Sequence, residues 1–189
     1  MTMSLPEAPP RSWLPRGRPL TAADLSTVPD DGHRYELIDG TLIVSAAPRP
    51  IHQDVLRNLL VAFDSAVPDT LKVYIAPLDV RLSDDTLVQP DVLIAPRAAF
   101  TDTNLPIAPL LAVEVLSPST RGIDQLLKRD RYERAGVEHY WIVDPAVPSL
   151  LALRVEHGTY EVLADVSGDE SWTSAEPVAV TVVPSALVR

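Results

Sequence analysis

Two acidic residues stand within apolar runs of this chain. Asp91 follows Pro90 and precedes the segment VLIA, and Glu114 lies in the middle of LLAVEVL, which is otherwise aliphatic. A carboxylate in a buried strand costs roughly several kcal/mol unless a cation or hydrogen-bond donors pair with it, so both positions need an explanation. A shared divalent cation beside a cationic side chain would explain both, and such an arrangement is suited to phosphodiester cleavage.

Length and composition indicate one soluble globular domain. The chain has 189 residues, of which 46% are hydrophobic and 22% charged, and no apolar run is long enough to cross a bilayer. The N-terminal residues have no apolar segment typical of a secretory signal. The absence of cysteine excludes disulfides and thiolate metal sites, and it suits a reducing compartment. We therefore expect a cytoplasmic protein without a membrane partner.

The charge of the chain limits its affinity for nucleic acid. The formal net charge is −10, and an acidic surface repels phosphates. One short segment is nevertheless rich in cationic side chains: Arg121, Lys128, Arg129, Arg131 and Arg134. A local basic patch can serve an acidic protein, although weak affinity or dependence on a partner is then expected.

The first third of the sequence predicts a leader, a short helix, a hairpin and a longer helix. Residues 1–19 are rich in proline and predict a flexible leader before a single domain over residues 20–189. Thr21 is placed to cap a helix over Ala22–Thr27. The pair Asp39-Gly40, between two alternating segments, is a strong hairpin signal. Apolar residues at helical spacing predict the longer helix over about 51–66.

The rest of the chain predicts mostly strands with one intervening helix. The segment LVQPDVLIAP reads as one strand, and LLAVEVL is apolar enough for an interior strand. SPST can cap the following helix, which we expect to end at Gly136. Further strands are expected over residues 72–77, 78–82 and 139–145, with a hairpin over 150–166 turning at His157-Gly158, and the tail from 167 to 189 reads as a weaker strand with loose ends.

This order of elements predicts the fold class. The strand, helix and strand over residues 110–144 favour a right-handed crossover between parallel neighbours. Antiparallel hairpins surround this unit, so the sheet should be mixed. We expect an α/β or α+β domain with a central mixed β-sheet flanked by helices.

The strand periodicity predicts where the two carboxylates point. Asp91 shares a face with Leu93, and Glu114 shares a face with Ala112, because side chains alternate along a strand. If the strands are neighbours, both carboxylates can reach one Mg²⁺ or Mn²⁺ ion, with water and a backbone carbonyl such as that of Val115 completing the ligands. The alternative is a pair of carboxylates at strand ends that accept backbone or arginine hydrogen bonds.

Lys128 has two interpretations. It follows Asp124 by four residues, so the two side chains share a helical face. They could form a solvated ion pair that supports the helix by about 0.3–0.5 kcal/mol. Alternatively, Lys128 could reach back to the metal site, where it would orient water or neutralise phosphate. The sequence leaves both open.

Several motifs follow one another along the chain: Glu36 in YELIDG, His52, Pro90–Val92, EVLSPST, Asp124, Lys128, Tyr132 and AGVEHYWIVDP. Together they resemble the Uma-two family of restriction-endonuclease-like proteins, in the PD-(D/E)XK superfamily. The resemblance extends from Leu20 to about Ala164. It implies a restriction-endonuclease-like core with Asp91 and Glu114 as metal ligands.

The chain departs from the superfamily pattern at Leu116, where the superfamily has a catalytic lysine two residues after the glutamate. The resemblance implies that this lysine has moved onto the helix as Lys128. Glu36 is then a further ligand or base, or else an exposed strand residue. His52 and Asp124 are expected to support the ligands from neighbouring positions.

Two functions from different classes remain open at this stage. The first is a Mg²⁺- or Mn²⁺-dependent endonuclease that cuts DNA, with RNA as another substrate and a homodimer as a plausible assembly. The second is a nuclease-fold binding or regulatory module without catalysis, which Leu116 and the acidic charge favour. A two-carboxylate sugar hydrolase is a weaker hypothesis, because aromatic residues are only 5% of the chain.

Arg121 and Arg131 could contact phosphate, or they could be solvated helix charges. Tyr140 and Trp141 read as packing residues.

Overall fold

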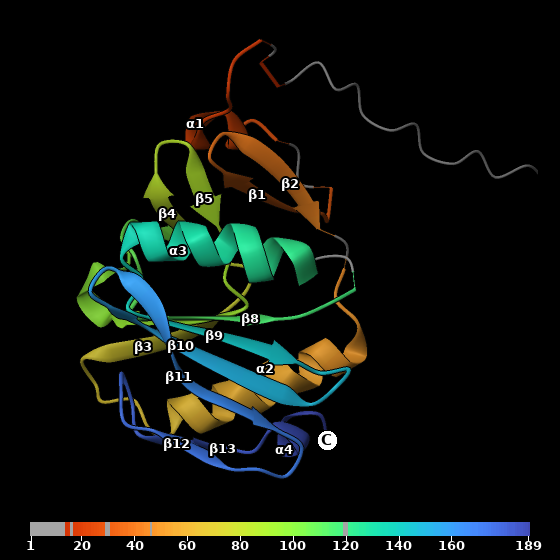
Figure 1. The fold of residues 1–189 in the computed structure, drawn as a ribbon. Coiled ribbons are helices and arrows are strands. Elements are labelled where there is room, and N and C mark those ends of the chain that lie inside the picture. The colour runs from red at the N-terminus through yellow and green to blue at the C-terminus, as the bar shows by residue number, and fades with distance from the viewer. Residues whose placement is uncertain (1–13, 16, 29–30, 46, 119–120) are drawn as a thin grey trace, which may run out of the picture.

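The computed structural model describes residues 14–15, 17–28, 31–45, 47–118 and 121–189 (Figure 1). Most of the expected leader, residues 1–13 and 16, lies outside the described residues, as do residues 119–120 of the expected helix cap. The short helix α1 (Ala22–Leu25) ends earlier than the sequence suggested. The Asp24 carboxylate accepts a hydrogen bond from the Thr21 backbone and pairs with Arg18 at 2.8 Å.

A six-stranded mixed sheet forms the centre of the molecule, which confirms the expected fold class. Its strand order is β11-β10-β9-β8-β6-β3, and only the β8–β9 pair is parallel. The connection between these two strands carries the helix α3 (Arg129–Ala135), as the sequence predicted. The strands are β3 (Leu71–Ile75), β6 (Val92–Pro96), β8 (Leu111–Val115), β9 (His139–Asp144), β10 (Ser149–Glu156) and β11 (Thr159–Ser167).

A second sheet of five strands has the order β2-β1-β5-β4-β7. The segment LVQPDVLIAP, which we expected to be one strand, is divided between the two sheets. Pro90 explains the division, because proline cannot donate to a sheet ladder and restricts the residue before it. Asp91 consequently lies just before β6 rather than within a strand. The strands are β1 (Arg34–Ile38), β2 (Thr41–Ser45), β4 (Asp79–Ser83), β5 (Thr86–Val88) and β7 (Asn104–Leu105).

Helices cover the two faces of the large sheet (Figure 1). On one face lies α2 (Pro50–Asp64), whose Phe63 packs against Trp141 with ring centroids 5.4 Å apart. On the other lie the π-helical turn η3 (Ile123–Lys128) and α3 (Arg129–Ala135), with the second sheet beside them. A 3₁₀ turn, η2 (Arg97–Ala99), follows β6. None of the helices in the described part of the chain has the length and hydropathy to span a bilayer.

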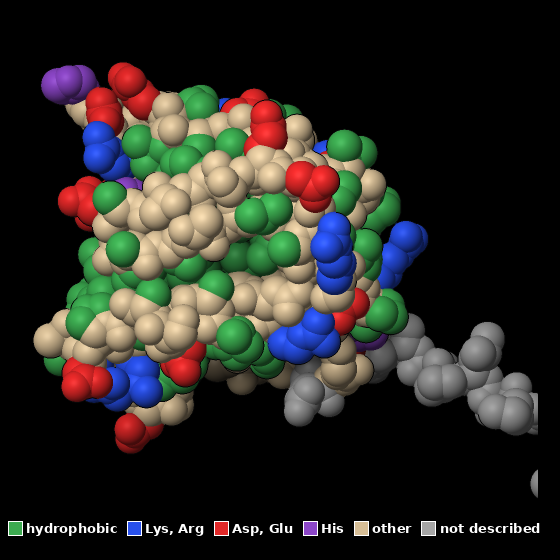
Figure 2. All heavy atoms as spheres, turned by 90° about the horizontal axis from the view of Figure 1, so that it is seen from below, with side chains coloured by type: hydrophobic (Ala, Val, Ile, Leu, Met, Phe, Trp, Pro, Cys, Tyr) green, Lys and Arg blue, Asp and Glu red, His purple; other side chains and the backbone are tan. Residues whose placement is uncertain are grey.

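The C-terminal tail is more ordered than the sequence suggested. It forms the hairpin β12 (Trp172–Ser174) and β13 (Val180–Val182), followed by α4 (Pro184–Leu187). The expectation of loose ends was wrong because alternate valines and Leu187 contribute to the core on the α2 side. Figure 2 shows the molecule from below, the side where Figure 1 places this hairpin, and basic side chains there lie in separate small groups rather than in one continuous patch.

Both predicted hairpin turns are confirmed. Asp39 and Gly40 have φ values of 47° and 75°, and His157 and Gly158 have 53° and 86°. A Cβ atom on Gly40 would lie 2.6 Å from the Pro19 Cβ, whereas Gly158 has no atom within 4 Å of that position. Gly40 is therefore needed both for the turn and for the close approach of residue 19.

We predict that Gly40→Ala destabilises the protein more than Gly158→Ala. Both substitutions place alanine in the left-handed region, which costs roughly 1–2 kcal/mol. Only Gly40→Ala adds the overlap with Pro19, so the free energy of unfolding should fall further in that variant. Urea denaturation of both variants measures the difference. Equal losses in the free energy of unfolding would show that Pro19 can move away from the new Cβ atom without destabilising the protein.

Candidate functional site

The candidate site lies where β1, β6 and β8 meet the helix η3–α3. In the β6–β8 ladder Val92 pairs with Val113, so the register places Asp91 opposite Glu114. Directly opposed residues of an antiparallel pair point to the same face. That face is the one of Leu93 and Ala112, which belong to the core on the α3 side. The structure therefore brings the two carboxylates together, with the predicted facing.

Lys128 is buried within this group of carboxylates. Its Nζ atom lies 2.9 Å from Glu36 Oε1, 3.0 Å from Glu114 Oε1 and 3.7 Å from Asp124 Oδ1. The side chain is 1% exposed, so the interpretation as a solvated ion pair is wrong. Burial opposes the charge of Lys128, but the three carboxylates outweigh burial and raise its pKa. The lysine is therefore a buried cation.

Glu36 is buried too, although an exposed strand residue was one expectation. Its Oε1 atom accepts a hydrogen bond of 2.8 Å from the backbone N–H of Gln89. Its Oε2 atom lies 3.2 Å from Arg34 NH2. Arg34 also donates to Asp91 Oδ1 at 2.8 Å, and so it connects the two carboxylates.

Sequence reasoning missed Arg34. Its position in the sequence indicates a place in the site, because Arg34 precedes Glu36 by two residues on β1. Side chains alternate along a strand, so both lie on one face. Burial opposes the charge of Arg34, but the Glu36 and Asp91 carboxylates outweigh it and raise its pKa. Arg34 is thus a second cation of the site.

Asp91 is held by three donors. Besides Arg34, the backbone N–H of Val115 donates to Oδ2 at 2.8 Å, and His52 Nε2 lies 3.1 Å from the same atom. Burial acts to raise the pKa of Asp91, but the His52 hydrogen bond and the charges of Arg34 and Lys128 lower it below its usual range. Asp91 is therefore ionised, and His52 lies beside it as predicted.

Glu114 differs from Asp91 in its environment. Its Oε1 atom accepts hydrogen bonds from Lys128 and, at 2.7 Å, from the Tyr132 hydroxyl. Its Oε2 atom is buried and has no hydrogen-bond partner among the described residues. Burial, together with the nearby carboxylates including Asp91, raises the pKa of Glu114 well above its usual value despite Lys128.

The charges of the site fit a divalent cation. Among the described residues, four carboxylates (Asp91, Glu114, Glu36 and Asp124) lie around two cations (Arg34 and Lys128), so carboxylates outnumber cations in the site. The free Glu114 Oε2 atom offers an oxygen ligand of the hard kind that Mg²⁺ and Mn²⁺ prefer. Val115 contributes its N–H to Asp91, and the ligand role of its carbonyl stays a prediction.

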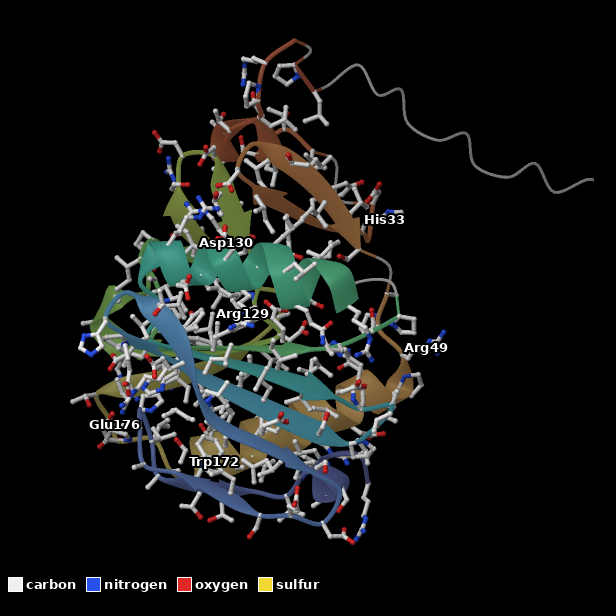
Figure 3. The ribbon with its side chains drawn as sticks, viewed as in Figure 1. His33, Arg49, Arg129, Asp130, Trp172 and Glu176 are labelled. Atoms are coloured by element: carbon white, nitrogen blue, oxygen red, sulfur yellow. The ribbon has the colours of Figure 1, made fainter. Side chains whose placement is uncertain are left out.

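A cavity of about 670 Å³ opens onto the site. Asp91 and Val115 line it together with Arg34, His52 and Gln89. His33 and Arg49 also line it, and Figure 3 labels both on the same side of the molecule. Glu114 and Lys128 do not line the cavity and are at most 1% exposed. Of the two opposed carboxylates, Asp91 thus lines the cavity and Glu114 does not.

The two arginines expected at phosphates lie in different environments. Arg121 is 44% exposed, and its NH2 atom lies 2.6 Å from Asp144 Oδ2. Arg131 is buried, and it donates to Thr86 and Ser83 of the second sheet at 3.0 and 2.7 Å. Neither a phosphate contact nor a solvated helix charge agrees with this burial, so we revise the expectation for Arg131. It connects α3 to β4 and β5.

The fold is that of a nuclease-like protein, as comparisons with known proteins show. The sequence model of the Uma2 family, described as "Putative restriction endonuclease", matches residues 22–183. The match covers well over half of the chain, so the chain belongs to this family. No curated protein matches the sequence significantly.

A solved structure shares the fold. It is described as "a putative nuclease belonging to DUF820" from Anabaena variabilis and superposes with a TM-score of 0.71. The alignment covers 90% of this chain and 98% of the other, at 18% sequence identity. The similarity supports the expected restriction-endonuclease-like core.

We predict that Arg34→Gln lowers the free energy of unfolding in metal-free buffer by about 3 kcal/mol, because it leaves buried carboxylates without a counter-charge. Arg81→Gln is the matched control, since Arg81 pairs with the exposed Asp84. Surface pairs of this kind contribute about 0–1 kcal/mol. Chemical denaturation compares the two variants. Equal small losses would mean that Arg34 does not balance the charge of the site.

Proposed function

We propose that the protein is an endonuclease that requires Mg²⁺ or Mn²⁺ and hydrolyses phosphodiester bonds of DNA. The observation that carries this proposal is the position of Asp91, just before β6, opposite Glu114 of β8, with a Glu114 oxygen that has no hydrogen-bond partner among the described residues and with more carboxylates than cations around it. Membership of the Uma2 family supports the reaction class.

The residues that would hold the metal are Asp91 and Glu114, with the backbone carbonyl of Val115 as a further ligand. A bound Mg²⁺ or Mn²⁺ ion would supply an acidified water molecule and charge stabilisation at the phosphate. Asp91 is suited to this task because it is ionised and lines the cavity. Glu114 would release its proton on binding, because a ligand carboxylate must be ionised.

Lys128 and Arg34 would act through charge. The Lys128 ammonium contacts Glu114 and Glu36, so it fixes both carboxylates, and its charge would act on the phosphate from behind them. Arg34 lines the cavity beside Asp91 and offers donors to an incoming phosphate. Preorganised cations of this kind stabilise the charge that develops in phosphoryl transfer.

The DNA would approach from the cavity side, where Arg49 lies at the start of α2 and is exposed. The net charge of −10 makes general attraction weak. Binding should therefore be weak and is best tested at low salt. Arg121 stays a candidate for phosphate contact because its side chain is partly exposed.

The alternative is a binding module that has the nuclease fold without catalysis. Two observations favour it: Glu114 and Lys128 are at most 1% exposed, and Leu116 occupies the position where the superfamily has lysine. The same metal-binding residues would then serve stability or regulation. Only a cleavage assay separates the two functions.

We predict that the wild type cuts plasmid DNA with Mg²⁺ or Mn²⁺ at low salt, and that Glu114→Ala abolishes cutting. Lys128→Ala should reduce the rate by about 10²-fold or more, the usual scale for loss of one electrostatic stabiliser. Lys128→Arg should not restore the full rate, because a planar guanidinium cannot replace a compact ammonium in a buried site. Gel electrophoresis of the digests measures these rates.

Lys72 is the other lysine of the chain and gives the matched control, since it lies on β3 away from the carboxylates. Lys72→Ala should cut DNA as well as the wild type. If the wild type cuts neither DNA nor single-stranded RNA with either metal at any salt concentration, the binding-module function replaces our proposal. If Lys128→Ala cuts at the wild-type rate, the assignment of the lysine is wrong.

A further inference from the structure

His139 is a buried histidine without hydrogen bonds from its ring among the described residues. It is the first residue of β9 and is 1% exposed. Its Nδ1 atom is buried and has no hydrogen-bond partner in the described part of the chain. Its Nε2 atom lies 3.8 Å from Glu138 Oε1, beyond hydrogen-bond distance. Buried polar groups are nearly always satisfied, so this ring needs an explanation.

Two carboxylates converge on this histidine. One ligand atom each from Glu138, His139 and Glu176 lies within 4.8 Å of the others. Glu176 belongs to residues 175–179, which connect β12 with β13, so the group joins the C-terminal hairpin to the large sheet. Both glutamate side chains are more than half exposed and can close around an ion.

The group is separate from the candidate nuclease site. His139 lies on the face of β9 that carries Trp141 and belongs to the α2 side, whereas Glu114 lies on the α3 side. Figure 3 shows Glu176 on the opposite side of the molecule from His33 and Arg49, which line the cavity. One ion cannot serve both places.

We propose that Glu138, His139 and Glu176 form a second metal site, which binds Zn²⁺ or a similar divalent transition-metal ion and ties the C-terminal hairpin to β9. An imidazole with two carboxylates is a ligand set that suits such ions, with water completing the coordination.

Arg154 sets the competing charge at this site. Its NH1 atom lies 3.7 Å from Glu176 Oε2, and its NH2 atom pairs with Glu156. The guanidinium therefore neutralises part of the Glu176 charge. The Arg154 guanidinium and a bound metal ion repel each other, because both are positively charged. The Arg154→Gln variant should therefore bind Zn²⁺ more tightly than the wild type does.

The test is calorimetric titration with Zn²⁺ at pH 7, together with the melting temperature in excess Zn²⁺ or chelator. Zn²⁺ should bind the wild type and raise its melting temperature, because a ligand of the native state stabilises it by mass action. Glu176→Gln and Glu138→Gln should each bind this ion at least tenfold more weakly. His139→Phe, which preserves the bulk of the ring, should no longer bind Zn²⁺ at this site. If the His139→Phe variant does not fold, the two variants at the exposed glutamates still test the proposal.

Two controls separate this site from other cation binding. Glu161→Gln removes an exposed carboxylate on β11 and should bind Zn²⁺ as the wild type does. Asp91→Asn impairs the candidate nuclease site and should keep the Zn²⁺ site, so a failure of the nuclease proposal leaves this inference standing. Wild-type Zn²⁺ affinity in both Glu176→Gln and Glu138→Gln, no binding by the wild type, or weaker binding by Arg154→Gln would overturn the proposal.

Discussion

The buried contact of Lys128 with Glu36 and Glu114 is the interaction on which the rest of the site depends. It joins the helix between β8 and β9, the large sheet and the second sheet at one point. Removing either partner would leave a buried charge uncompensated, which is strongly destabilising. The two sheets and the crossover helix are therefore positioned around a charge cluster as well as around two apolar cores.

This cluster also explains why the chain tolerates so many acidic groups in its interior. Arg34 and Lys128 neutralise part of the carboxylate charge, and the pKa values of Asp91 and Glu114 move in opposite directions. Asp91 accepts hydrogen bonds from a backbone N–H and an arginine and lies beside a histidine. Glu114 is fully buried and has one oxygen without a hydrogen-bond partner among the described residues. A divalent cation would complete the balance that the protein groups leave open.

Much of the fold was predictable because its signals are local. The Asp39-Gly40 and His157-Gly158 turns, the helix end at Gly136 and the alternation along β8 follow from short segments of sequence. The division of LVQPDVLIAP between two sheets was missed, although Pro90 pointed to it. The C-terminal hairpin was missed because its valines are buried only through packing on the α2 side of the large sheet.

The candidate site was predictable in its residue types but not in its connections. Asp91, Glu114 and Lys128 could be singled out because charged residues in apolar or helical settings require partners. The contacts of Arg34 and Tyr132 with the site could not be predicted, because they link segments that are far apart in the chain. Arg131 was expected at the surface because helical spacing alone does not reveal the second sheet that covers it.

The most direct test of this account is a crystal structure of the protein grown with Mn²⁺, with the ion located by its anomalous scattering. We expect an ion bound by Asp91 and by Glu114 through its Oε2 atom, with Lys128 still in contact with Glu36. An ion bound elsewhere, with Asp91 and Glu114 still held only by Arg34, His52 and Lys128, would contradict it. The cluster would then be a self-contained structural network of charges.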